Sequence, residues 1–257
     1  MTSINLKMMI KDNPILKGLL GNDKDFCERI YSGDLDRYVN RLKAIGFSGK
    51  QKVLDAGCGF GQWSFSLSEL NAHVSAFDYS SIRIAACEEI NKRHFKKEHI
   101  SFREGNLEKI DFPENYFDLV FCYSSIYFTN PELSLKEIFR VLKKGGRVYI
   151  NTNDFGWYLH NLENNQNGSN FFSAKKMAIE SIQNSFNFYA NNKRERGKQI
   201  IMPVDYTLRI MRKLGFSGLI TDGDGLLNFN KKITEPLSFF KKEYKGQSGV
   251  YEVIGQK

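Results

Sequence analysis

The segment Val53–Gly61 constrains the fold of this chain more than any other stretch. It reads Val-Leu-Asp-Ala-Gly-Cys-Gly-Phe-Gly, so an apolar pair runs into an acid and glycines follow at alternate positions. Glycine is needed where the backbone takes a positive φ or comes close to a ligand. The residues 61–70 then begin a helix, whose first N–H groups have no partner within the helix. The pattern predicts a nucleotide-type pocket at the end of a buried parallel strand.

The acid and the glycine spacing indicate what kind of ligand fits. A dinucleotide-binding fold carries G-x-G-x-x-G and places the pyrophosphate at the helix N-terminus. This chain carries G-x-G-x-G, with Asp55 two residues before the first glycine. A carboxylate at that point would repel a pyrophosphate, but it suits a ligand that carries an ammonium or sulfonium charge.

A second strand, expected over residues 73–78, also ends in an acid. Asp78 has two acceptor oxygens and can therefore accept hydrogen bonds from both hydroxyls of a ribose 2′,3′-diol. Asp78 could instead cap the helix predicted over residues 82–91. The two roles are compatible, because Ser80 or Ser81 can supply the cap while Asp78 points at the ligand.

Further segments continue the alternation of strand and helix. One strand ends at Gly105 and is followed by a polar loop that carries Asn106. The next strand is expected over residues 117–123. A helix over 133–142 is followed by a glycine turn and a fifth strand, which together span residues 143–150. Continuous alternation of this kind predicts one α/β domain.

Taken in order, the segments between residues 50 and 152 resemble the motifs of the class I S-adenosylmethionine (SAM)-dependent methyltransferases. The resemblance implies a Rossmann-like, seven-stranded, mostly parallel sheet with helices on both faces and an antiparallel last strand. It also implies SAM as the cofactor and S-adenosylhomocysteine as the product. In the family an acid usually stands where this chain has Asn106, which keeps a carbonyl acceptor but loses the charge. The cofactor-binding residues implied by the resemblance are Asp55, Gly57, Cys58, Gly59, Gln62, Trp63, Asp78, Tyr79, Asn106, Leu107 and Tyr123.

The first 50 residues are expected to form a helical lid on the methyltransferase domain of residues 51–257. Apolar side chains recur at three- and four-residue steps over residues 23–44, which is typical of one amphipathic helix or of two short ones broken near Gly33. In the family this region often covers the SAM pocket, so its tyrosines are candidates to contact SAM or the acceptor. The alternative is that they simply pack on the sheet domain.

The specificity-determining part is expected after the fifth strand. Residues 154–198 form a helical insertion, which would sit over the carboxyl edge of the sheet, where ligands bind in open α/β folds. A helix over 203–214 and strands over 216–221 and 250–254 complete the domain. The connection over 222–248 is unusually long for a hairpin and can fold back on the acceptor site.

Methyl transfer from a sulfonium is an in-line displacement, so the protein mainly holds donor and acceptor in line. A hydroxyl acceptor gains from a general base. His160 is the one histidine expected near the acceptor, although a lone histidine is more often structural. Tyr127, beyond the fourth strand, is the second catalytic candidate. The substrate-binding candidates are Tyr31, Tyr38, Ser124, Trp157, Arg194 and Arg196.

The formal charge of +8 is compatible with nucleic acid, a membrane surface or an anionic small molecule as the partner. The basic residues fall in short scattered groups, which is typical of a solvated surface. One group, residues 193–198, lies where the acceptor is expected. Arg194 or Arg196 could bind an anionic acceptor through paired hydrogen bonds.

The remaining composition narrows the class of protein. The cysteines show no C-x-x-C pair and no zinc spacing, so no metal site is expected. No stretch approaches the roughly 20 apolar residues of a membrane span. Residues 1–10 lack the features of a signal peptide. A cytoplasmic protein without a membrane partner is therefore expected.

Three functions compete. The leading one is a SAM-dependent methyltransferase acting on an O or N atom of a small metabolite, with phosphorylated and nucleotide- or sugar-linked anions among the acceptors considered. The second is an RNA-modifying methyltransferase, suggested by the pI near 9.2. Against it, the chain has no appended RNA-binding module and no N-P-P-[YF] motif, but Cys122-Tyr123-Ser124-Ser125, after the fourth strand. The third is a non-catalytic binding subunit, against which the intact loop and both acids argue.

Overall fold

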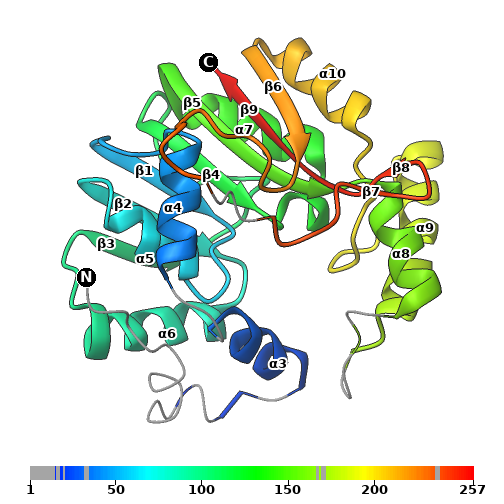
Figure 1. Cartoon of the computed structure of the whole chain (residues 1–257), viewed down its shortest axis with the longest axis horizontal. Coiled ribbons are helices and arrows are strands. Elements are labelled where there is room, and N and C mark those ends of the chain that lie inside the picture. The colour runs from blue at the N-terminus through cyan, green and yellow to red at the C-terminus, as the bar shows by residue number, and fades with distance from the viewer. Residues whose placement is uncertain are drawn as a thin grey trace.

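The computed structural model describes residues 15, 18–19, 21–31, 35–165, 168, 172–234 and 238–257. Among these residues, seven strands form one sheet (Figure 1). The strands of this sheet are β1 (Lys52–Ala56), β2 (His73–Asp78), β3 (Ile100–Glu104), β4 (Phe117–Tyr123), β5 (Leu142–Asn153), β6 (Ser217–Gly223) and β9 (Val250–Gln256).

The sheet has the order β3-β2-β1-β4-β5-β9-β6. Strands β1 to β5 pair in parallel, and β9 is antiparallel to both of its neighbours, β5 and β6. The predicted Rossmann-like sheet with an antiparallel last strand is therefore confirmed. The strand order reverses between β1 and β4, which is the topological switch point where open α/β sheets bind ligands.

Helices cover both faces of the sheet (Figure 1). They are α3 (Gly21–Ile30), α4 (Asp36–Ala44), α5 (Gln62–Ser68), α6 (Ser81–Ile90), α7 (Pro131–Val141), α8 (Phe155–Asn164), α9 (Ala174–Asn191) and α10 (Val204–Leu214). Successive strand residues point to opposite faces. In β1, Val53 packs in the core shared with α4, α5 and α6, whereas Leu54 packs in the core shared with α7 and α10.

Local sequence signals explain where several helices begin and end. Ser80 caps α6 by accepting a hydrogen bond from the Arg83 N–H group, as the sequence predicts. Asn130 caps α7, and Pro131 occupies the first turn of that helix, where a missing N–H group costs nothing. Gly215 ends α10 with a φ of 101°, a conformation that favours glycine.

The N-terminal segment forms two short helices, α3 and α4, rather than one long one. The predicted break at Gly33 lies outside the described residues, as do residues 1–10. Tyr38 and Leu42 of α4 are buried in the same core as Val53 and Phe121 of the sheet. The N-terminal helices and the sheet therefore share one hydrophobic core.

The insertion after β5 contains α8 and α9, which pack on each other and on Ile201. The long connection between β6 and β9 returns across this insertion and includes a hairpin of β7 (Glu243–Tyr244) and β8 (Gln247–Ser248), which lies against α8 (Figure 1). A Cβ atom at Gly156 of α8 would lie 2.3 Å from the Gln247 carbonyl oxygen, so only glycine allows this close approach.

In the part of the chain that the structure describes, no helix is both long and apolar enough to cross a membrane.

Candidate active site

The glycine loop runs from the end of β1 into α5 at the carboxyl edge of the sheet. Gly57, Gly59 and Gly61 have φ values of 84°, 57° and 85°. A Cβ atom at Gly57 would lie 2.5 Å from the Ser125 side chain, beyond the end of β4. The loop therefore needs glycine both for its backbone conformation and for its close approach to the β4 end.

Asp78 lies at the same edge of the sheet, at the end of β2. Its Oδ2 atom accepts a hydrogen bond from the Gly59 N–H group at 2.9 Å, and its Oδ1 atom accepts one from the Ser80 N–H group at 3.0 Å. A carboxylate oxygen has two lone pairs, so each oxygen can still accept from a ligand hydroxyl. The carboxylate thus holds the glycine loop in shape and keeps its capacity to bind a diol.

Asp55 is fully buried at the end of β1. It accepts a hydrogen bond from the Ser64 hydroxyl group at 2.6 Å. Burial raises the pKa of Asp55 to about 7, the Ser64 hydrogen bond opposes that shift, and the nearby Asp78 adds to it. Near neutral pH the carboxyl group is therefore close to its midpoint, and a cation bound beside it would favour the ionised form.

The residues after β3 divide between the site and the solvent. Leu107 is buried, and its side chain would lie 3.8 Å from a Cβ atom at Gly57. Asn106 is exposed, and its Oδ1 atom accepts a hydrogen bond from the Glu108 N–H group at 2.9 Å. Tyr79 is 85% exposed beside Asp78. Leu107 and Asp78 thus meet at the glycine loop, whereas Asn106 turns its carbonyl oxygen to its own loop.

Two polar atoms at the start of α5 test whether a ligand fits here. Gln62 Oε1 and Trp63 Nε1 are buried, and neither has a hydrogen-bond partner among the residues that the structure describes. Buried polar atoms are nearly always paired in proteins. An acceptor and a donor left unpaired beside a glycine cradle fit a polar ligand such as SAM. Cys58, in the same loop, is buried.

The end of β4 has an unusual backbone. Ser124 has a φ of 53°, which is uncommon for a residue other than glycine. Its hydroxyl group donates to Asn151 Oδ1 at 2.8 Å, while the Tyr123 hydroxyl group donates to Asp224 Oδ1 at 3.2 Å. Burial raises the pKa of Tyr127 to about 12, against the effect of hydrogen bonding with Ser124. Tyr127 therefore stays a neutral phenol at physiological pH.

The predicted lid tyrosines are buried and bonded to the backbone. The Tyr31 hydroxyl group donates to the carbonyl oxygen of Phe60 in the glycine loop. The Tyr38 hydroxyl group donates to the Ile30 carbonyl oxygen at 3.1 Å, and its ring packs on Trp63 at 4.8 Å between centroids. Both residues fasten the N-terminal helices beside the glycine loop, which favours a packing role over direct contact with an acceptor.

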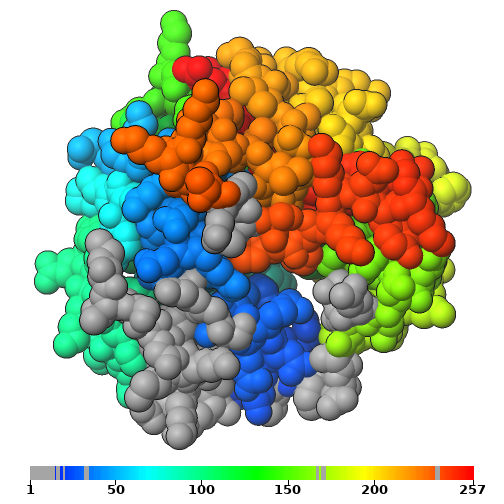
Figure 2. All heavy atoms as spheres, viewed as in Figure 1, coloured from blue at the N-terminus to red at the C-terminus, as the bar shows by residue number. Residues whose placement is uncertain are grey.

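An open cavity of about 530 Å³ lies between α8 and the connection that leads to β9. Trp157 and His160 line it from one side, and Phe239, Phe240 and Lys241 line it from the other. The His160 ring packs edge to face on Tyr244, with 4.9 Å between centroids. Figure 2 shows the surface hollowed between α3, α8 and residues 238–249. The structure thus brings two of the predicted acceptor-side residues to one cavity.

The predicted arginines lie elsewhere. Arg194 forms an ion pair with Glu108 and donates a hydrogen bond to the Phe128 carbonyl oxygen at 3.2 Å. Its charge is therefore neutralised within the protein. Arg196 is exposed. Neither arginine lines the cavity beside α8.

Sequence reasoning missed the residues that tie the acceptor side together. Asp224 is 1% exposed and bonds to Tyr123, Asn151 and Phe239. Its position directly after β6 was the only signal for it, and no motif marks it. Within the described residues, no group of three or more His, Cys, Asp or Glu side chains is arranged to hold a metal ion.

The fold and the glycine loop together define the class I methyltransferase architecture. The chain belongs to the methyltransferase-domain family, whose model matches residues 47–207.

Similar proteins cover different parts of the chain. Demethylmenaquinone methyltransferase of Lactococcus lactis is 37% identical over 42% of this chain and 44% of its own length. The ubiquinone/menaquinone biosynthesis C-methyltransferase UbiE of Vibrio cholerae is 27% identical over 49% of this chain and 51% of its own length. The chain thus spans about half the length of these curated relatives.

Among solved structures, phosphoethanolamine N-methyltransferase 2 of Haemonchus contortus superposes with a TM-score of 0.62. The superposition covers 95% of this chain and 60% of that one, at 17% sequence identity. At this identity the likeness shows the fold alone.

Proposed function

We propose that this enzyme transfers the methyl group of SAM to an oxygen or nitrogen atom of a small acceptor molecule. The observation that carries the proposal is the cavity of about 530 Å³ beside α8, lined by Trp157, Phe239 and Phe240. Small-molecule sites are typically concave, largely apolar and roughly 300–1,000 Å³ in volume. Phe239, which lines the cavity, also packs on Tyr123 at the end of β4, with 6.3 Å between the ring centroids.

The cofactor would be held by the residues around the glycine loop. Asp78 can accept from the ribose hydroxyl groups, and Asp55 supplies negative charge beside a ligand that carries a sulfonium. Gln62 Oε1 and Trp63 Nε1 offer the unpaired acceptor and donor. Gly57, Cys58, Gly59 and Leu107 form the cradle. Tyr79 and Asn106 stay candidates at the exposed rim.

On the acceptor side, the chain mainly supplies orientation. An aromatic wall and the Ser124 hydroxyl group would fix the acceptor in line with the methyl donor, and such positioning can lower a barrier by on the order of 7–11 kcal/mol. His160 is the group at the cavity that could take a proton from a hydroxyl acceptor. The phenol of Tyr127 can donate a hydrogen bond. Its raised pKa keeps it protonated at physiological pH, so it cannot act as a base.

A lysine at the cavity favours an acceptor with negative charge. Lys241 lines the cavity opposite His160. Phosphorylated and nucleotide- or sugar-linked metabolites fit that description. Arg194 contributes less than the sequence predicts, because Glu108 already neutralises it. Arg196 remains available at the surface.

The proposed function can be tested before the acceptor is identified. The protein is incubated with SAM that carries a ¹³C-labelled methyl group and with either a metabolite extract or total RNA, and S-adenosylhomocysteine release is measured by mass spectrometry. Release with the metabolite extract alone is expected. NMR of the labelled product then distinguishes O-, N- and C-methyl groups. A C-methyl product, as the name of the UbiE relative suggests for that protein, would overturn the choice of acceptor atom.

RNA is the second candidate acceptor, because the chain has a formal charge of +8. Many basic side chains are paired with acids, however: Arg83 with Asp23, and Lys143 with Asp118. Pairing lowers the positive potential that a phosphate backbone would meet. Product formed only with total RNA would favour this candidate over the first.

A further inference from the structure

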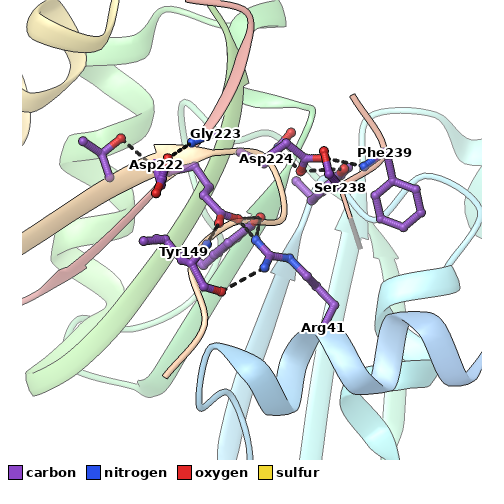
Figure 3. A network of polar contacts seen from close by, with 12 residues as sticks. Arg41, Tyr149, Asp222, Gly223, Asp224, Ser238 and Phe239 are labelled. Atoms are coloured by element: carbon purple, nitrogen blue, oxygen red, sulfur yellow. Dashed lines mark hydrogen bonds and ion pairs between the residues drawn. The ribbon is translucent and has the colours of Figure 1, made fainter. Parts of the chain in front are cut away.

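The connection between β6 and β9 carries a buried carboxylate that has no part in the function proposed above. Asp224 follows β6 directly and is 1% exposed. Its Oδ1 atom accepts hydrogen bonds from the Asn151 side-chain amide at 2.8 Å and from the Tyr123 hydroxyl group at 3.2 Å. Its Oδ2 atom accepts one from the Phe239 N–H group at 2.8 Å. Figure 3 shows the Asp224 side chain facing Ser238 and Phe239.

The donors come from parts of the chain that are far apart in sequence. Tyr123 ends β4, Asn151 belongs to β5, and Phe239 lies in the connection that leads to β9. A buried carboxylate is costly unless it is hydrogen-bonded, so these contacts hold the three segments together. Burial also raises the pKa of Asp224, and the hydrogen bonds oppose that shift.

Asn151 extends the network to the end of β4. While its amide nitrogen donates to Asp224, its Oδ1 atom accepts from the Ser124 hydroxyl group at 2.8 Å. Ser124 is the residue with a φ of 53°. A strained backbone persists only where its surroundings hold it, and such residues cluster at functional sites. Asp224 is therefore linked, through Asn151, to the Ser124 hydroxyl group at the end of β4.

The residues 238–242, here called the strap, form one wall of the acceptor cavity. The Phe239 ring packs on Tyr38 at 5.7 Å and on Trp63 at 6.4 Å, and the Phe240 ring packs on Trp157 at 4.9 Å. The strap thus joins the aromatic residues beside the glycine loop to those of α8. Its position depends on the backbone contact that Phe239 makes with Asp224.

Two glycines make room for the strap. A Cβ atom at Gly223 would lie 2.7 Å from the Lys242 side chain, and one at Gly249 would lie 2.5 Å from the Lys241 carbonyl oxygen. Such contacts are too close for any other residue without a shift of the backbone. The backbone at Gly223 and Gly249 can therefore lie this close to the strap only because neither residue has a side chain.

We propose that Asp224 is a positioning residue for methyl transfer: it holds the strap closed over the acceptor cavity and fixes the Ser124 hydroxyl group at the end of β4. The proposal rests on the proposed function, since it assigns the cavity to the acceptor. Asp224 is not among the residues that line the cavity. Its loss should therefore impair acceptor use and leave SAM binding largely intact.

The two tryptophans of the chain give a readout that needs no acceptor. Trp63 and Trp157 each pack on a phenylalanine of the strap. In Asp224→Asn the charge is lost and an amide N–H group faces one of the former donors, so the strap should loosen. We expect quenching of tryptophan fluorescence by acrylamide to increase at least twofold. The SAM dissociation constant, from calorimetric titration, should change less than twofold.

The matched control is Asp222→Asn, two residues earlier. Asp222 pairs with Lys242 of the strap, but their side chains are 35% and 60% exposed, so the pair contributes little. Quenching in this variant should equal that of the wild type. Equal quenching in Asp224→Asn and the wild type would overturn the proposal, as would a loss of SAM affinity as large as the gain in quenching.

Kinetics and hydrogen exchange complete the test. With the metabolite extract that supports turnover, Asp224→Asn should lower kcat/KM for the acceptor at least tenfold while the KM for SAM stays within twofold.

If the variant does not fold, hydrogen exchange in the wild type decides, because a Phe239 amide bonded to Asp224 must be protected from exchange. Rapid exchange there overturns the proposal. If no extract supports turnover, the function proposed above fails, while quenching still tests Asp224.

Discussion

The cofactor edge and the acceptor side of this protein are built in opposite ways. At the cofactor edge, Asp78 bonds to Gly59, 19 residues away, and Asp55 bonds to Ser64, 9 residues away. On the acceptor side, Asp224 bonds to Tyr123 across 101 residues. The first is encoded by a nearly continuous stretch of sequence, whereas the second exists only when distant segments have come together.

The two regions also differ in the chemistry that holds them. The cofactor edge consists of glycine backbone and acids, and it leaves buried polar atoms unpaired for a ligand. The acceptor side rests on a buried polar network, drawn in Figure 3, in which Arg41 of α4 pairs with Glu252 of β9 and donates to the Leu227 carbonyl oxygen at 3.0 Å. Tyr149 donates to Glu252 at 2.8 Å. The cofactor edge leaves an acceptor and a donor for a ligand, whereas the acceptor side consists largely of contacts between its own side chains, with Arg41 Nε buried and without a hydrogen-bond partner among the described residues.

The largest expected effect is a loss of stability when the buried ion pair on the acceptor side is removed. Arg41→Ala leaves the Glu252 carboxylate buried without its cation, and removing one partner of a buried pair costs about 3–5 kcal/mol. Urea denaturation should show that loss in the free energy of unfolding. The control is Arg93→Ala, whose pair with Glu89 is partly exposed and should cost less than about 1 kcal/mol. Similar losses in both variants would contradict the central role of the buried pair.

This contrast explains what the sequence could predict. The glycine loop, the acid at the end of β2 and the Ser80 cap follow from contiguous residues and local geometry, so they were predictable. The mostly parallel, seven-stranded sheet and its antiparallel last strand followed from the resemblance that those motifs carry. The fold-back of the long connection could be expected from its length alone.

The side-chain partners on the acceptor side could not be predicted. Arg194 was expected at the acceptor, but it pairs with Glu108, 86 residues earlier in the chain. Nothing in the sequence around either residue marks that pair. Asp224 and Asn151 are likewise 73 residues apart and carry no motif. Long-range polar pairing depends on how the elements pack, which local patterns do not encode.

A second prediction concerns the cofactor edge. In Gly57→Ala the new Cβ atom would lie 2.5 Å from Ser125 in a backbone with a φ of 84°. The loop must shift, so SAM affinity in a calorimetric titration should fall by about 100-fold, equivalent to about 2.7 kcal/mol. Gly49→Ala is the control, because Gly49 has a φ of 72° but open space around it. If both variants bind SAM equally, the loop tolerates the new Cβ atom at Gly57 and the prediction is wrong.

The third prediction separates the two functions of Asp78. Asp78→Ala removes the acceptor of the Gly59 N–H group and the proposed acceptor of the ribose hydroxyl groups. Hydrogen bonds to a charged group contribute about 1.5–3 kcal/mol, so SAM affinity should fall by roughly 10- to 100-fold. The acceptor cavity should keep its tryptophan quenching. Unchanged SAM affinity would remove Asp78 from the cofactor site.

The smallest expected effect, taken over any one pH unit, is a pH dependence at Asp55. Burial raises the pKa of Asp55 to about 7, whereas the ordinary pKa of an aspartate is 3.8. Between these values the folded protein binds more protons than the unfolded chain, so the free energy of unfolding falls as pH rises, by at most about 1.4 kcal/mol per pH unit. The stabilisation is complete below pH 3.8 and lost as pH rises through about 7. Asp55→Asn should abolish this slope and raise stability at pH 8.

Two comparisons sharpen that test. Burial works to raise the pKa of Asp118, but hydrogen bonds from Lys143 and from the backbone lower it overall. Asp118→Asn should therefore be less stable than the wild type above pH 4. This effect is opposite in sign to that of Asp55→Asn. Because a ligand cation favours the ionised Asp55, SAM affinity in the wild type should rise between pH 6 and pH 8, and in Asp55→Asn it should be weaker and independent of pH. A wild-type affinity that does not change with pH would place Asp55 among the structural groups rather than beside the cofactor.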